Sequence, residues 1–249
     1  MKFSKLILLA MLMFFCSCEI KSSLSKGKVE DLSLIGAEFE ITTSNGNDVY
    51  AKGNLYDKDG DAIDNDSIKI KVNNIDLILG KIPGMGLNDY EYKAYDKIPI
   101  SDNYKFEIIL TNGKKYFLGT IKPIAKVNKN DIVCNEVGDL NKDCIISWQN
   151  LKDFNKLVID KSYQSLKPDS TNNYITSGNR LIEKIKENGI YSIPKSDYKQ
   201  SKIPIQLIAF HFNASKFATL NSDLIQGSKI TISESIDKVI SFEPNNDKQ

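Results

Sequence analysis

The sequence of 249 residues contains little arginine, histidine or tryptophan: Arg180, His211 and Trp148 are the only residues of their kinds. Positive charge is therefore carried almost entirely by lysine, which excludes a cluster of arginines that clamps phosphates or carboxylates in bidentate fashion. The 33 lysine and arginine residues nearly balance the 32 aspartate and glutamate residues, and the formal net charge is +1. This balance gives no reason to expect a nucleic acid as a partner.

Long hydrophobic runs are also scarce, and the longest, Leu6–Phe15, follows Lys2 and Lys5 near the start of the sequence. About ten apolar residues are too few to cross a hydrocarbon core of roughly 30 Å, but they suit the apolar region of a signal peptide. The run ends at Phe15-Cys16-Ser17-Cys18. An ordinary secretory signal cleaved nearby and an uncleaved membrane anchor are the alternative interpretations.

Ser17 before Cys18 resembles the lipobox of bacterial lipoproteins, although that family usually has Leu where Phe15 stands. The resemblance implies a signal peptide over residues 1–17 and acylation of Cys18 with fatty acids such as palmitate. It further implies attachment to a membrane through this lipid, in the cell envelope, at the outer membrane or the cell surface. Residues 18–36 are then expected to form a lipidated N-terminus and a flexible, polar tether.

Four cysteines are present, and this resemblance places Cys16 in the signal peptide and a lipid on Cys18. The remaining pair, Cys134 and Cys144, is expected to form a disulfide in the oxidising compartment that the resemblance implies. Two buried free thiols are the alternative.

Residues 37–125 alternate between short β-type runs and turn residues. Tyr104, Phe106 and Ile108 alternate with polar residues, a period of two that is typical of a half-buried antiparallel strand. Asn112-Gly113 then predicts a hairpin turn before Lys115–Ile121. Further strands are expected at residues 37–42, 48–56, 67–72, 75–79 and 89–95. The pattern predicts a first β-sandwich domain over residues 37–125.

The polar stretch 123–130 suggests a boundary, and residues 126–249 are expected to form a second β-sandwich domain. Ile203–Phe212 is almost continuously apolar, as expected for a central strand. Arg180–Asn188 fits a helix or a strand, and the strand is slightly favoured. Further strands are expected at residues 143–148, 155–160, 189–194, 228–233 and 238–242.

Asp57–Val72 resembles a hairpin of immunoglobulin-like or transthyretin-like repeats in bacterial surface lipoproteins. Ile145–Trp148 and Asn188–Pro194 are similar to segments of fibronectin-III-like envelope modules. The resemblance implies an all-β fold of two tandem immunoglobulin-like β-sandwich domains.

Two acidic loops are candidate calcium sites, because calcium prefers six to eight oxygen ligands. The first surrounds Gly60 and contains Asp57, Asp59, Asp61, Asp64 and Asp66. The second, within Val137–Phe154, resembles a dockerin-type calcium loop, with Asp139, Asn141 and Asp143 at ligand positions and Cys144 where glycine is usual. A solvated turn is the favoured interpretation of the first loop and a strand that of the second, so no cofactor is expected, with calcium left as a possibility.

Catalytic motifs are weak. His211 lies in an apolar run. A histidine in such a run is more often a strand residue whose ring is hydrogen-bonded within the protein than a general base. No G-x-S-x-G motif is present, and Gly84-Met85-Gly86 lacks the third glycine of a dinucleotide loop. Tyr90 and Tyr92 could present two rings on one strand face as a ligand platform, with core packing as the alternative.

These observations predict a non-catalytic binding or adhesion module for a glycan or an envelope protein. A passive spacer or assembly subunit of the envelope is the alternative. A calcium-dependent module or a secreted hydrolase is a third, weaker hypothesis.

Overall fold

The computed structural model describes residues 21–44, 48–82, 90–164, 174–176, 181–199 and 205–242. Within these residues almost all regular structure is β-strand, with three short 3-10 turns and one helical turn, α2 (Ser196–Lys199). The expected all-β fold is therefore confirmed. The predicted signal peptide (residues 1–17), Cys18 and Gly84-Met85-Gly86 lie outside the described residues.

The strands of the first half agree closely with the expected ranges. They are β1 (Gly36–Ser44), β2 (Asp48–Tyr56), β3 (Lys69–Val72), β4 (Ile75–Lys81), β5 (Tyr90–Lys93), β6 (Tyr104–Ile109) and β7 (Lys115–Ile121). The predicted Asn112-Gly113 turn joins β6 to β7, and Gly113 adopts a φ of 80°, in the left-handed region that glycine favours.

The second half contains shorter strands and two long ones. They are β8 (Ile132–Cys134), β9 (Cys144–Trp148), β10 (Phe154–Gln164), β11 (Tyr174–Thr176), β12 (Leu181–Lys184), β13 (Gly189–Ile193), β14 (Ile205–Phe217), β15 (Thr219–Leu220) and β16 (Lys229–Ser241). The strand interpretation of the ambiguous segment is confirmed for Leu181–Lys184, because β12 pairs with β10.

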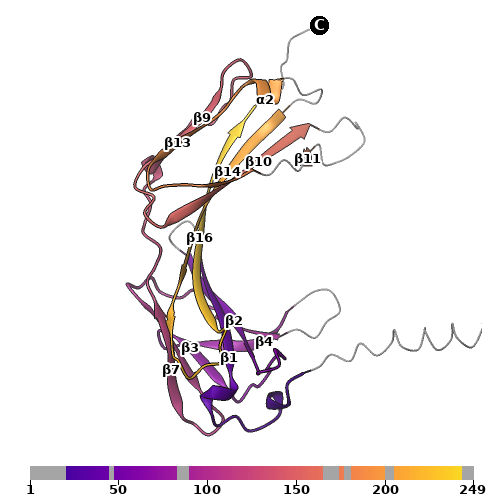
Figure 1. Cartoon of the computed structure of the whole chain (residues 1–249), viewed down its shortest axis with the longest axis vertical. Helices are drawn as coiled ribbons and strands as arrows, with labels where there is room; N and C mark the ends of the chain where they lie inside the picture. Colours follow the sequence, from indigo (N-terminus) through magenta and orange to yellow (C-terminus); the bar gives the residue numbers. More distant parts are fainter. Residues whose placement is uncertain are drawn as a thin grey trace, which may run out of the picture.

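One hydrogen-bonded path of strands runs through both halves, in the order β11-β10-β14-β16-β1-β2-β5-β4-β3-β6-β7-β15, with β12 also on β10. A separate small sheet has the order β13-β9-β8. Figure 1 shows a bowed molecule in which β16 runs from one end towards the other.

The strand β16 joins the two halves. The sequence predicts two strands, at 228–233 and 238–242, but the structure has one strand of 13 residues. It pairs in parallel with β1 and antiparallel with β14. Both β16 and β15 come after residue 125, yet β16 pairs with β1 and β15 pairs with β7. The described residues therefore have no clear arrangement of two separate sandwiches, and the boundary at residue 125 stays a prediction.

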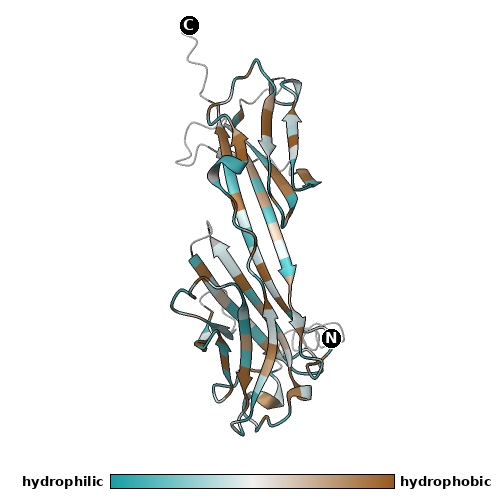
Figure 2. Ribbon diagram, turned by 90° about the vertical axis from the view of Figure 1, so that its left-hand side faces the viewer, coloured by the Kyte–Doolittle hydropathy of each residue, from teal (hydrophilic) through white to brown (hydrophobic). Residues whose placement is uncertain are grey.

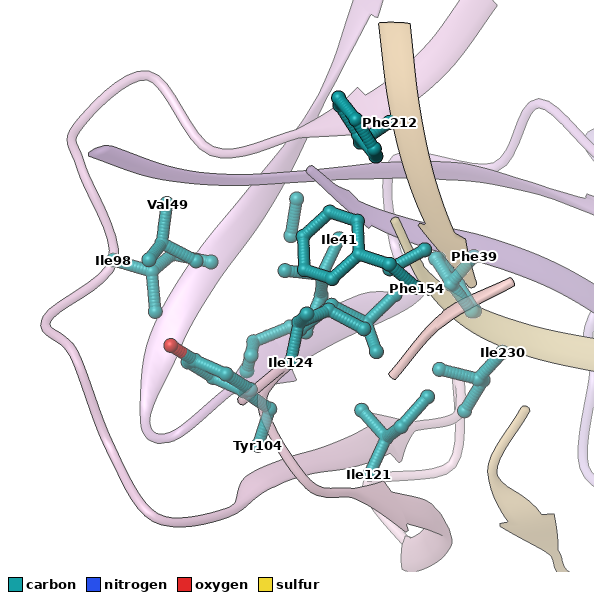
Figure 3. Packing of buried hydrophobic residues seen from close by; sticks show 14 of the residues in the cluster. Phe39, Ile41, Val49, Ile98, Tyr104, Ile121, Ile124, Phe154, Phe212 and Ile230 are labelled. Carbon is teal, nitrogen blue, oxygen red and sulfur yellow. The ribbon is translucent and has the colours of Figure 1, made fainter. Parts of the chain in front are cut away.

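The core is likewise continuous. Phe39 of β1 packs on Phe106 of β6 with ring centroids 5.5 Å apart, and Trp148 of β9 packs edge-on against Phe212 of β14 at 5.4 Å. Figure 3 shows Phe39, Phe154 and Phe212 within one cluster of buried side chains. Along each strand, apolar and polar residues alternate, as Figure 2 shows. This alternation places the apolar side chains of a strand on the face that is turned towards the core.

Residues 21–36 correct the expectation of a flexible tether. Val29, Leu32 and Ile35 are buried, and the N–H of Val29 donates to Oγ1 of Thr111 at 2.8 Å. Asn65 donates through Nδ2 to the carbonyl oxygens of residues 24 and 27. Three apolar residues in a polar segment are too few to predict that the segment packs on the protein. In the structure, each of the three side chains is buried in the core.

Candidate functional site

A hollow of about 630 Å³ lies where β1, β10, β14 and β16 meet. Besides Lys156, His211 and Glu234, which bring titratable groups, its lining consists mainly of hydroxyl and amide side chains, among them Thr42, Asn213, Ser215, Ser233 and Ser235. Such groups donate and accept hydrogen bonds without carrying charge. The hollow is therefore suited to bind a polar, uncharged ligand.

Strand alternation explains why these polar residues share one face. On β14, Phe210 and Phe212 are fully buried, while His211, Asn213 and Ser215 between and beyond them point to the other side. In Figure 1, β9 and β13 lie on the outer side of the bow, where Trp148 contacts Phe212. The polar side of β14 therefore turns towards the inner side.

Cross-strand register places the polar residues side by side. Thr42 of β1 is opposite Ser233 of β16, and Ser233 is opposite Ser215 of β14. On the other side, Thr42 is opposite Tyr50 of β2. Four adjacent strands thus contribute one row of side chains to the same face.

His211 borders the hollow between two carboxylates. Its Nδ1 is 2.7 Å from Oδ1 of Asp237, and its Nε2 is 3.4 Å from Oδ2 of Asp160. Asp237 is directly opposite His211 on β16, and Asp160 comes from β10. Both ring nitrogens of the histidine therefore lie near carboxylates, and the side chain is on the polar face of β14 rather than in the apolar core.

Glu234 is the titratable residue of the hollow with a perturbed pKa. Partial burial raises the pKa of this carboxyl, and a hydrogen bond with Thr43 opposes the shift. Glu234 is in register with Thr43 on β1 and with Ala214 on β14, all of which border the hollow. Ionisation of Glu234 at neutral pH therefore destabilises the folded state.

The first acidic loop is organised by its own backbone. Oδ1 of Asp57 accepts hydrogen bonds from the N–H groups of Asp59 (2.9 Å) and Asp61 (3.0 Å). A hydrogen bond with Ser22 lowers the pKa of Asp57. The carboxylate of Asp64 pairs with the Lys21 ammonium at 2.9 Å.

Asp66, the last acid of this loop, accepts a hydrogen bond from the Ser67 hydroxyl at 3.4 Å. In the part of the chain that the structure describes, which includes both acidic loops, no three Asp, Glu, His or Cys residues are grouped to hold a metal ion. The carboxylates of Asp57, Asp64 and Asp66 instead have partners within the protein: backbone N–H groups, the Lys21 ammonium and the Ser67 hydroxyl.

The second acidic loop also differs from a calcium loop. Oδ1 of Asp139 accepts from the N–H of Asn141 at 2.8 Å, and Oδ1 of Asp143 accepts from the N–H of Lys195 at 3.0 Å. The chain then continues as strand β9, Cys144–Trp148, instead of the helix that follows a dockerin loop. Its carboxylates thus stabilise turns.

The predicted tyrosine platform is not formed. Tyr92 is 1% exposed, and its hydroxyl donates to the carbonyl oxygen of Asn65 at 2.7 Å. Tyr90 is half-buried, with the Lys21 ammonium 4.8 Å from its ring centroid. The period of two places both rings on one face, but that face of β5 is the core face.

Cys134 and Cys144 are free cysteines in the structure, so the predicted disulfide is not formed. Cys134 of β8 is opposite Ile146 of β9, which leaves Cys144 one diagonal step away. Diagonal neighbours are about 7–8 Å apart, whereas the Cα atoms of two residues joined by a disulfide are usually about 4.4–6.8 Å apart. Burial raises the pKa of Cys134 and raises that of Cys144 to about 11.

Sequence reasoning missed the row of polar side chains because it divided β16 at its centre. Ser233 and Ser235 alternate with Ile232 and Ile236, which is a detectable period of two. The same alternation extends through Ser215 at the end of β14, beyond the expected limit at residue 212.

None of the helices in the described ranges has the length and apolar character needed to span a membrane. Comparison of the sequence with protein-family models and with curated proteins finds no match in either case.

Proposed function

We propose that this protein is a lipid-anchored protein of the cell envelope, attached through acylated Cys18, and that it is a non-catalytic binding module for a glycan or a protein. The Lys2–Cys18 segment supports the anchor, since a charged start, an apolar run and Ser17-Cys18 follow in lipoprotein order. The observation that carries the binding role is the polar hollow on the inner side of the bow.

A finer description of the fold is part of the same proposal. We infer that the strands towards each end of the path form an immunoglobulin-like layered unit. The long strands β14 and β16 belong to both units. The Phe39–Phe106 and Trp148–Phe212 contacts support it, because each joins strands from two packed layers.

The anchor is tested by metabolic labelling with an alkyne analogue of palmitate in a bacterium that processes lipoproteins. Cys18→Ala is expected to abolish labelling and to release the protein from the membrane fraction, whereas the matched variant Cys16→Ala is expected to keep both. Labelling that survives Cys18→Ala, or that requires Cys16, would contradict acylation at Cys18.

The binding role is tested with the full chain purified in detergent and incubated with envelope glycan and envelope protein fractions separately. Co-sedimentation with either fraction is expected, and retention by neither would overturn the proposal. The latter result would favour a passive spacer, for which the continuous strand β16 between the two ends is the supporting observation.

A further inference from the structure

We propose that the ligand of the binding module is a neutral glycan that lies across the inner face of the sheet, between two exposed aromatic rings. The site, here called the inner strip, consists of Tyr50, Thr42, Ser233, Ser215 and Phe217. This inference rests on the proposed binding function and adds the ligand class and the residues that contact it.

The two rings lie at opposite sides of the polar row. Tyr50 is 41% exposed on β2, and Phe217 is 73% exposed at the end of β14. Phe217 is opposite Thr231 of β16, one step along the same face from Ser233. From β2 to β14 the row crosses three strand spacings, roughly 14 Å, which is a length suited to a short oligosaccharide.

Packing on the core side holds both rings outward. Val49 and Ala51, which flank Tyr50, are at most 2% exposed and fix the orientation of β2. Beside Phe217, the Lys216 ammonium reaches the opposite side of β14, where it lies 2.6 Å from Asp153 and donates to the carbonyl oxygen of Pro123 at 2.9 Å. If either strand rotated about its axis so that its ring became buried, these contacts would be broken.

The chemistry of the strip matches that of a sugar. A pyranose ring has apolar C–H faces and a rim of hydroxyl groups, so it can stack on an aromatic ring while its rim exchanges hydrogen bonds. Between the rings, Thr42, Ser233 and Ser215 offer hydroxyl groups, and Asn213 adds an amide at the hollow.

Charge around the strip favours a neutral ligand over a charged one. The Ser233 hydroxyl donates to Oε1 of Glu40 at 2.9 Å, and His211 faces the Asp237 carboxylate at 2.7 Å. The Lys229 ammonium lies 2.6 Å from Oε1 of Glu38, and both Lys156 and Glu234 line the hollow, so charges of both signs border the strip. A strongly anionic or cationic ligand would lack a concentrated opposite charge here.

The test uses the full chain in detergent and a panel of neutral oligosaccharides, with and without N-acetyl groups, with affinity measured by titration calorimetry. Tyr50→Ala and Phe217→Ala are each expected to weaken binding by about five- to tenfold, the loss of one stacked ring. Tyr50→Phe is expected to retain affinity, since it keeps the ring. Phe117→Ala, which removes an exposed ring from β7, is the matched control and is expected to have no effect.

The outcomes separate this inference from the proposed function. Glycan binding that is unchanged in both Tyr50→Ala and Phe217→Ala would overturn the inner strip as the site while leaving a glycan-binding module. Binding of envelope protein but of no oligosaccharide would overturn the glycan and leave the binding module. Circular dichroism of each variant, expected to match the wild type, shows that a loss of affinity does not come from unfolding.

Discussion

His211 and Asp237 face each other across β14 and β16, with Nδ1 of the histidine 2.7 Å from Oδ1 of the aspartate. Both side chains are partly exposed, and contacts between exposed polar or charged side chains contribute about 0–1 kcal/mol. Asp237→Ala is therefore expected to lower the free energy of unfolding by less than about 1 kcal/mol in urea titrations. Phe212→Ala, next to His211 but fully buried against Trp148, is expected to cost about 3–5 kcal/mol. Equal losses would show that the His211–Asp237 contact stabilises the fold more than its exposure allows.

Glu107 makes the stability of the protein sensitive to acid. Hydrogen bonds from Lys105 (2.7 Å) and Lys115 (2.8 Å) lower its pKa in the folded state. A lowered folded pKa contributes stability above the unfolded pKa, and this stability is lost as the pH falls through the folded pKa. Glu107→Gln is therefore expected to lower the thermal midpoint at pH 7 more than at pH 3. Glu30→Gln, at an exposed site, serves as the control, and an equal effect of Glu107→Gln at both pH values would contradict the prediction.

Glu234 is expected to behave in the opposite way. Burial raises its folded pKa, so the stability linked to this carboxyl is present below the unfolded pKa and is lost as the pH rises through the folded pKa. Glu234→Gln, which removes the partly buried charge and keeps a partner for Thr43, is expected to raise the thermal midpoint at pH 7 and to leave it unchanged at pH 3. A lower midpoint at pH 7 would show that the ionised carboxylate stabilises the fold.

Cys144 is expected to react slowly with alkylating reagents. Burial raises its thiol pKa from the usual 9.0 to about 11, and the thiolate is the reactive form. At pH 8 with reductant present, iodoacetamide should modify Cys144 at least about a hundredfold more slowly in the native protein than in urea. Peptide mass spectrometry in a Cys134→Ser background assigns the site. Equal rates in the two states would mean that Cys144 is not protected by burial.

Gly53 marks a point where the backbones of β1 and β2 approach closely. A Cβ atom built at this position would lie 2.3 Å from the carbonyl oxygen of Glu38 and 2.3 Å from Cδ1 of Phe39. Gly53→Ala is expected to destabilise the protein by about 1–3 kcal/mol or more, because backbone atoms must move. Gly60→Asn, in an open turn with a φ of 85° that asparagine tolerates, is the control for a neutral effect in chemical unfolding.

The sequence by itself determined most of the individual strands. The bounds of β2 and β7 agree with the expected ranges at both ends, and Asn112-Gly113 forms the expected turn. These features depend on alternation and turn chemistry within a few residues, which a single sequence contains. At β12 the local signal fitted a helix or a strand and favoured the strand only slightly, and the pairing with β10 decided it.

Only the tertiary structure decided which strands pair and which faces become buried. The parallel pairing of β16 with β1 joins Phe39 to Ile230 across almost the whole described chain, and no local pattern encodes it. The same pairing creates the row from Tyr50 to Ser215, while Tyr92 of β5, which pairs with β2 and β4, is buried in the core. Burial and register depend on the partner that covers a strand, so the inner face of the sheet exists only once distant strands are side by side.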